Sequence, residues 1–147
     1  MDYLEYASEK LRAGGYRITA PRTRVLALLD GEERALSPYD IRDRLGRQRV
    51  KMDVVTVYRA LEVLERLGLV HRVYSTGGYV RCWRSDLGEH HHHLVCTDCG
   101  RIVEITGDPM EQVVDRVEGE SGYRVTGHIL ELVGLCRGCQ PPKQRKR

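Results

Sequence analysis

The feature that most constrains this chain is a run of four histidines followed closely by two cysteines. Residues 90–93 are all histidine, and Cys96 and Cys99 come soon after them. Imidazole and thiolate are the side-chain groups that bind zinc and similar divalent metals in proteins. A histidine run is also typical of a purification tag, but a tag lies at a terminus and this run is internal. The sequence therefore predicts a protein that folds around metal ions.

The spacing of the cysteines narrows the kind of metal site. Cys96 and Cys99 form one C-x2-C motif, and Cys136 and Cys139 form a second near the end of the sequence. Two such motifs supply the four thiolates of a closed tetrahedral zinc site. Five cysteines is an odd number, which favours metal thiolates in a reducing cytoplasm over a disulfide framework. We expect these four cysteines to hold a structural zinc.

The histidine run can serve more than one site. If residues 90–96 form a strand, successive side chains point to opposite faces. His91 and His93 then share one face, and His90 and His92 share the other. The same strand could therefore contribute ligands to two further metal sites.

Length and charge limit the class of protein. A chain of 147 residues holds one ordinary domain or two small ones. No apolar run approaches membrane-spanning length, and residues 1–5 lack the features of a signal peptide. Residues 1–78 carry 14 basic and 11 acidic side chains, whereas residues 79–142 carry 6 and 10. The basic first half suggests a nucleic-acid partner.

The first half has the pattern of a winged helix. Capping residues and apolar spacing predict four short helices. These are residues 3–13 and the segments that follow the caps Thr19, Ser37 and Asp53. Residues 69–83 then read as a β-hairpin around a turn at 75–78. In a winged helix the last helix before the hairpin reads the major groove of DNA. A winged helix that binds a protein instead of DNA is the alternative.

The expected hairpin brings two ligand-type side chains together. A four-residue loop at 75–78 pairs Tyr74 with Tyr79, which places His71 opposite Cys82. Directly opposed residues have Cβ atoms roughly 4.5–5.5 Å apart, a spacing that suits a shared zinc. The alternative is that Cys82 is a small buried hydrophobe and His71 a surface residue.

The second half predicts a small α+β unit. After a connector at 84–89, the expected order is strand, strand, helix and strand, with His128 in the middle of the last strand. The helix runs from Asp108 to about residue 120, with its apolar side inside the fold. These apolar residues are Met110, Val113, Val114 and Val117. The last strand is expected over residues 123–133.

Sequence signatures of enzymes are missing. The chain has no catalytic triad signature, no phosphate-binding glycine loop and no H-E-x-x-H motif. A catalytic zinc needs an open coordination position and a general base, which Glu104 or Glu111 could supply. A metal hydrolase therefore stays an alternative, but it would not explain the winged helix. We expect no enzymatic activity and no small-molecule substrate.

The chain resembles the ferric uptake regulator family of bacterial metal-sensing repressors. The resemblance extends from about Leu11 to Cys139 and is carried by four stretches. They are Pro21-Arg22, residues 56–59, residues 90–100 and the region of His128 and Cys136. It implies a homodimer that binds double-stranded operator DNA and no membrane. The implied fold is α+β, with a winged-helix DNA-binding domain at 1–83 and a metal-binding dimerisation domain at 84–140. The basic residues at 141–147 are expected to form a disordered tail.

Within the family, the likeness is to the zinc uptake regulators. These have a cysteine in the strand after the wing, as at Cys82, where iron sensors typically have glutamate, and a ligand after the recognition helix, as at His71. The histidine that iron sensors often carry before the Ser37-like cap is replaced here by Arg34-Ala35. The resemblance implies a sensory zinc site. Its ligands would be His71, Cys82, His91 and His93, with Glu104 at a position that sometimes joins it.

The resemblance also implies a third metal site and a set of DNA contacts. The third site comprises His90, His92, Glu111 and His128. Tyr39 and Arg59 would read bases, with Thr56 and Tyr58 near the DNA backbone. The implied function is a zinc-responsive transcriptional repressor that controls zinc uptake genes and holds two or three Zn²⁺ per subunit. A sibling sensor of iron, manganese or nickel is the alternative.

Overall fold

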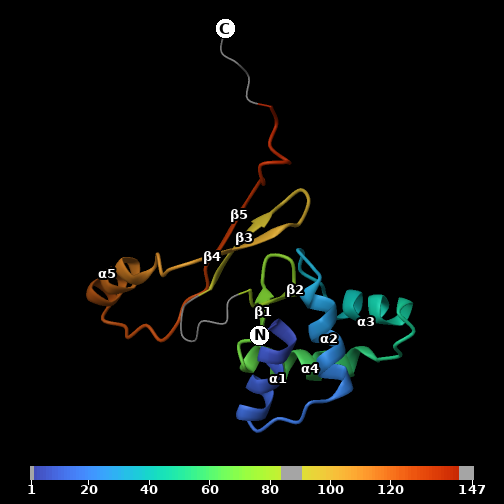
Figure 1. Ribbon diagram of the computed structural model, residues 1–147. Coiled ribbons are helices and arrows are strands. Elements are labelled where there is room, and N and C mark those ends of the chain that lie inside the picture. The colour runs from blue at the N-terminus through green and yellow to red at the C-terminus, as the bar shows by residue number, and fades with distance from the viewer. Residues whose placement is uncertain (1, 84–90, 143–147) are drawn as a thin grey trace. The chain divides into compact units, whose positions relative to one another are not determined.

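The computed structural model describes residues 2–83 and 91–142 of the chain (Figure 1). They belong to two compact units, residues 1–85 and residues 86–147. The first unit contributes four helices and a hairpin, and the second contributes a helix and a three-stranded sheet. The expected α+β class is therefore confirmed. Of the predicted disordered tail at 141–147, residues 143–147 lie outside the described residues.

The first unit is a winged helix, as the sequence predicted. Its elements are α1 (Tyr3–Ala13), α2 (Ala20–Asp30), α3 (Pro38–Arg47), α4 (Val54–Arg66), β1 (Val70–Val73) and β2 (Gly78–Arg81). Strands β1 and β2 pair antiparallel and form the wing. None of the described helices has the length and apolar character needed to cross a membrane.

Local capping determines where these helices begin. The Asp53 carboxylate accepts a hydrogen bond of 2.7 Å from the Thr56 amide at the start of α4. Ser37 and Asp40 cap each other's amides at the start of α3. Thr19 precedes α2 without a side-chain hydrogen bond, so Pro21 in the first turn is the remaining start signal there.

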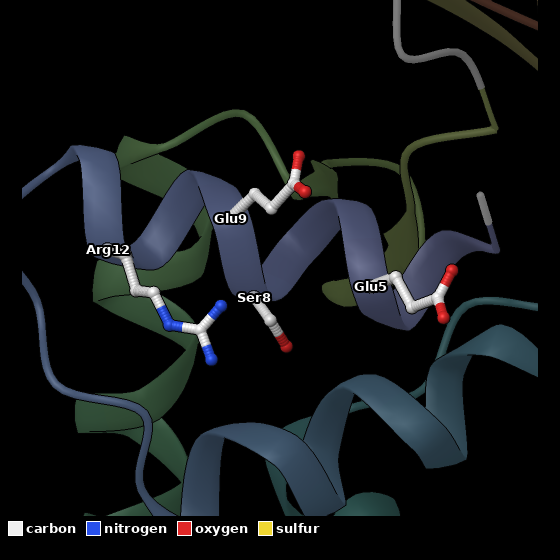
Figure 2. A pocket seen from close by; sticks show the side chains of 4 residues that line it. All are labelled: Glu5, Ser8, Glu9 and Arg12. Atoms are coloured by element: carbon white, nitrogen blue, oxygen red, sulfur yellow. The ribbon is translucent and has the colours of Figure 1, made fainter.

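Leucine and valine side chains from all four helices fill the core of this unit. On α4, Val57 and Leu64 are fully buried and Leu61 is 1% exposed, as expected from their helical spacing. Helix α1 buries Ala7 and Leu11 in the same cluster. Its polar side lines an open pocket of about 470 Å³ (Figure 2). The pocket residues are Glu5, Ser8, Glu9 and Arg12.

The register of the wing differs from the prediction. Val73 pairs with Gly78, so the turn comprises residues 74–77, and His71 lies opposite Val80 instead of Cys82. The predicted pairing was therefore wrong by two residues. A shift of two positions keeps every side chain on the same face of a strand. Cys82 thus remains on the face of His71, as its diagonal neighbour.

Packing outside the hairpin explains this register. A Cβ atom added to Gly78 would lie 2.8 Å from the Cβ of Ala35, so only glycine fits against this segment. Leu36 then pairs with Tyr79 through two backbone hydrogen bonds of 2.8 and 3.0 Å. The segment before α3 therefore selects the start of β2, which the hairpin sequence alone does not indicate.

The second unit has the predicted order of two strands, a helix and a strand. Its elements are β3 (His92–Cys96), β4 (Ile102–Ile105), α5 (Glu111–Ser121) and β5 (Glu131–Gly134). The sheet order is β4-β3-β5, with β4 antiparallel and β5 parallel to β3. The last strand begins at Glu131 instead of residue 123. In the described chain the pairing of β5 with β3 starts at Glu131, which lies opposite His93.

Helix α5 departs from the prediction in its packing. It buries none of its residues in the single chain. Val113 is 40% exposed and Val117 is 42% exposed, although both were expected inside the fold. Apolar side chains of the sheet are also exposed, among them Val103 and Val133. The described part of one chain therefore leaves the apolar surface of this unit uncovered.

Candidate metal and DNA-binding sites

The two C-x2-C motifs converge in the second unit. The sulfur atoms of Cys96, Cys99, Cys136 and Cys139 all lie within 4.8 Å of one another. The Sγ atoms of Cys99 and Cys136 are 3.8 Å apart. Four sulfurs placed tetrahedrally around zinc, each about 2.3 Å from the metal, are separated by about 3.8 Å. The donor set and its spacing therefore fit a zinc ion.

The strands and their turns bring these cysteines together. Cys96 ends β3, and a turn closed by a hydrogen bond of 3.0 Å from the Gly100 amide to the Cys96 carbonyl presents Cys99. Gly100 has φ +75°, a left-handed conformation that glycine adopts without strain. Parallel pairing of β5 with β3 places Gly134 beside Cys96, so that Cys136 follows within reach.

The thiols of this cluster do not ionise independently. Backbone amides donate hydrogen bonds to the Cys96 sulfur and lower the pKa of this thiol to about 6, and the amide of Cys136 has the largest effect. Hydrogen bonding of its thiol to Cys136 and Asp98 raises the pKa of Cys139 well above its usual range. Four thiolates this close repel one another unless a cation compensates their charge. The electrostatics therefore also favour a bound divalent metal.

In the first unit, His71 and Cys82 form a pair of possible ligands at the base of the wing. Their ligand atoms lie within 4.8 Å of each other, although the two residues are diagonal and not directly opposed. Cys82 is 5% exposed. Its amide donates a hydrogen bond of 2.9 Å to the Leu69 carbonyl, which extends the hairpin ladder by one pair. We call His71 and Cys82 the wing pair.

In the second unit, His91 and Glu104 form another such pair. The His91 Nδ1 atom contacts the Glu104 carboxylate, which projects from β4. His93 lies opposite Glu104 in the register of β3 and β4 and is 5% exposed. Burial lowers the pKa of His93, so this ring is neutral at pH 7. Among the residues that the structure describes, His91 and Glu104 belong to one group of side chains close enough to share a metal ion, and His93 does not belong to it. We call His91 and Glu104 the sheet pair.

A third group lies between the sheet and the start of α5. The Nε2 atoms of His92 and His128 are 3.8 and 3.6 Å from the same Asp108 oxygen. The two imidazole rings are 5.2 Å apart between centroids. Two nitrogens and one carboxylate oxygen suit a divalent transition metal. Burial of His92, which is 3% exposed, keeps this donor out of bulk water.

The expected third site comprised a different set of residues. The structure brings together His92 and His128 from that set, and His90 lies outside the described residues. Glu111 lines a pocket of about 260 Å³ beside Asp108 and His128, but Asp108 is the carboxylate of the ligand group. The sequence predicts Asp108 only as the residue at which the helix begins. Its carboxylate lies just before that helix and three positions from Glu111, and this closeness in sequence was the signal that could have identified it as a ligand.

The side chains expected to contact DNA lie on α3 and α4. Tyr39 on α3 is 53% exposed and Tyr58 on α4 is 46% exposed. Arg59 is exposed, and Thr56 is half-buried in the first turn of α4. The Arg42 guanidinium lies 5.3 Å from the centre of the Tyr39 ring. The outward side of α4 thus carries aromatic and basic groups, whereas its inward side is apolar.

Comparison with known proteins identifies the family. A model described as the ferric uptake regulator family matches residues 13–133. The ferric uptake regulation protein of Neisseria meningitidis serogroup A is 34% identical over 138 residues, covering 92% of this chain and 94% of the relative. The zinc uptake regulation protein of Escherichia coli K12 is 33% identical over 124 residues, covering 84% and 72%.

A solved structure gives the same result for the fold. It is described as a zinc uptake regulator complexed with zinc and DNA, and it matches with a TM-score of 0.83 and 30% identity. The match covers 92% of this chain and 91% of that one. The chain therefore belongs to the ferric uptake regulator family of metal-sensing transcription repressors.

Proposed function

We propose that this protein is a zinc-responsive repressor that binds operator DNA as a homodimer and controls zinc uptake genes in the cytoplasm. The observation that carries the proposal is the wing pair, in which the Cys82 thiol lies within 4.8 Å of a ligand atom of His71. A thiolate beside an imidazole is a soft donor set, which favours zinc over manganese or iron(II). The proposal rests on this pair because sequence identity to the relatives does not distinguish iron from zinc as the sensed metal. An iron regulator and a zinc regulator are about equally similar to this chain.

The sensory site in this proposal joins the wing pair to the sheet pair. Its ligands are His71, Cys82, His91 and Glu104, and His93 is the alternative to Glu104. A metal ion held by donors from both units restricts the angle between them. Zinc would then select the arrangement in which the two recognition helices of a dimer fit successive major grooves. Linkage requires that operator DNA tighten sensory zinc binding by the same factor.

The exposed apolar surface of the second unit supports the homodimer. Helix α5 and the sheet leave valines such as Val113, Val117 and Val133 between 40% and 59% exposed. Several exposed apolar side chains in one small unit are typical of a protein that forms an interface with another chain. A second copy of the chain would cover it and bring two winged helices to one operator. The proposed activity involves no catalysis.

Two further metal roles belong to the proposal. The four cysteines would hold a structural zinc, and His92, Asp108 and His128 would bind a third metal ion, which gives two or three per subunit. A sensor of iron, manganese or nickel is the second candidate, favoured by the 34% identity to a ferric uptake regulation protein. The absence of a histidine at Arg34-Ala35 and the presence of Cys82 favour zinc over this candidate.

A zinc titration of operator binding tests the proposal. Wild type and Cys82→Ser are compared at buffered free zinc, with parallel series in iron(II) and manganese. We expect wild type to bind DNA at far lower free zinc than the variant, while both retain the structural zinc and the dimer. Overlapping zinc curves would exclude Cys82 as a sensory ligand. Activation of wild type by iron(II) at lower free metal than zinc would favour the iron sensor.

A further inference from the structure

The N-terminal helix reaches the wing through a single tyrosine. Tyr3 begins α1, and its hydroxyl donates a hydrogen bond to the Leu69 carbonyl. The same carbonyl accepts the Cys82 amide at 2.9 Å. A carbonyl oxygen has two lone pairs and can accept both donors. The backbone of Cys82 and the hydroxyl of Tyr3 are therefore linked through one acceptor atom.

Cys82 depends on this acceptor because of its place in the hairpin. It follows the last residue of β2, and Leu69 precedes the first residue of β1. The Leu69–Cys82 hydrogen bond is therefore at the end of the ladder, where strands open most easily. The peptide of Leu69 is buried together with its side chain, which is 0% exposed. A second donor on this carbonyl restrains the peptide to which Cys82 is bonded.

Tyr3 is itself held in place from two sides. It shares one face of α1 with Ala7 and Leu11, which are fully buried, whereas the four polar residues labelled in Figure 2 lie on another side of the helix. The Arg81 guanidinium lies 4.9 Å from the centre of the Tyr3 ring. Arg81 in turn forms an ion pair of 3.0 Å with Asp30 at the end of α2.

We propose that Tyr3 is a positioning residue of the sensory site, which acts by holding the backbone of Cys82 through the Leu69 carbonyl. This inference rests on the proposed role of Cys82 as a zinc ligand. Groups that orient a ligand residue without contacting the metal themselves typically contribute 10- to 100-fold to metal affinity. Restraint before binding also reduces the entropy that the metal must remove. Helix α1 would thereby set the zinc concentration at which the repressor responds.

The test measures the affinity of the sensory site in the full-length dimer with its structural zinc in place. A fluorescent chelator competes for zinc with wild type and with Tyr3→Phe, which removes only the hydroxyl. We expect the variant to bind sensory zinc about tenfold more weakly. Tyr16→Phe is the matched control, because it removes a hydroxyl bonded to Arg66 at 3.0 Å. Its zinc affinity should equal that of wild type.

A double-mutant cycle separates positioning from general destabilisation. If Tyr3 acts through Cys82, Tyr3→Phe should have no effect on zinc affinity in a Cys82→Ser background. When cobalt is added to protein that keeps its structural zinc, Tyr3→Phe should change the thiolate-to-cobalt charge-transfer band, because Cys82 is the only thiolate of the proposed sensory site. If Tyr3→Phe lowered zinc affinity by the same factor in both backgrounds, or left the charge-transfer band unchanged, the positioning role would be overturned.

Two outcomes distinguish this inference from the proposed function. If Cys82→Ser leaves zinc affinity unchanged, the sensory role of Cys82 is wrong and the inference fails with it. If Cys82→Ser weakens zinc binding but Tyr3→Phe does not, only the positioning role is wrong. Arg81→Gln, which removes the cation over the ring, is the second variant should Tyr3→Phe not fold. It should weaken zinc binding by a smaller factor, and unchanged affinity would overturn the inference.

Discussion

The sulfur atoms of Cys99 and Cys136 lie 3.8 Å apart although 37 positions separate them in the sequence. This distance equals the edge of a zinc–thiolate tetrahedron, about 3.8 Å for zinc–sulfur bonds of about 2.3 Å. The two residues reach it because β5 pairs in parallel with β3. The cluster therefore links the first strand of the second unit to the end of the chain's last strand.

Replacing Cys136 by serine should remove the structural zinc and unfold the second unit. Formation of such sites is coupled to folding, with apparent binding free energies on the order of 10 kcal/mol. Metal content after gel filtration, circular dichroism and the molar mass in solution measure the effect. Cys82→Ser is the control and should keep the structural zinc, the fold and the dimer. A folded, zinc-free dimer of Cys136→Ser would contradict the prediction.

Replacing Arg59 by alanine should relax the sequence preference of DNA binding. Arg59 is exposed on α4, and a bidentate contact of arginine to guanine contributes about 1–3 kcal/mol of discrimination. Affinities for operator and mutated operator are compared at the same salt concentration, because phosphate contacts depend on salt. Arg66→Ala, at the end of the same helix, is the control. Equal discrimination by wild type and Arg59→Ala would exclude a base contact.

Acidification should weaken the first unit through the cap of α4. The Thr56 amide donates to the Asp53 carboxylate and holds its pKa below the ordinary 3.8. A carboxyl with a lowered pKa stabilises the fold above its unfolded-state pKa, and this contribution is lost as pH falls through the folded-state pKa. Asparagine caps about as well but does not titrate there.

The variant Asp53→Asn isolates this effect from the acid sensitivity of the metal sites. Urea unfolding of both proteins between pH 7 and pH 2 gives the difference in free energy of unfolding. We expect the free energy of unfolding of wild type, relative to that of the variant, to be constant near neutral pH and to fall below about pH 4, since the lowered pKa lies under 3.8. A difference that stays constant down to pH 2 would show that Asp53 does not titrate with folding.

Asp108 should contribute more than Glu111 to the third metal site. One Asp108 oxygen lies within 3.8 Å of the Nε2 atoms of both His92 and His128. Asp108→Asn should therefore lower metal affinity at this site by at least about tenfold, the usual effect of disturbing a metal's immediate surroundings. Calorimetric titration of zinc into protein that keeps only the structural zinc measures it. A larger loss in Glu111→Gln than in Asp108→Asn would reverse the assignment.

Local signals in the sequence determined the helices of the first unit. Asp53 and the Ser37–Asp40 pair mark the starts of α4 and α3 because capping involves only neighbouring residues. The buried stripe on α4 follows from helical spacing alone. The two C-x2-C motifs likewise predicted which cysteines cluster, since their chemistry allows few alternatives.

Contacts between distant segments decided the rest. The register of the wing depends on how Gly78 packs against Ala35, and the start of β5 depends on where β3 offers a pairing edge. Sequence spacing cannot indicate that Asp108 joins His92 and His128, or that Glu104 meets His91, because folding alone sets these distances. Local patterns therefore determined the helix starts and the thiol cluster, whereas tertiary packing decided the strand registers and the carboxylates that complete the histidine groups.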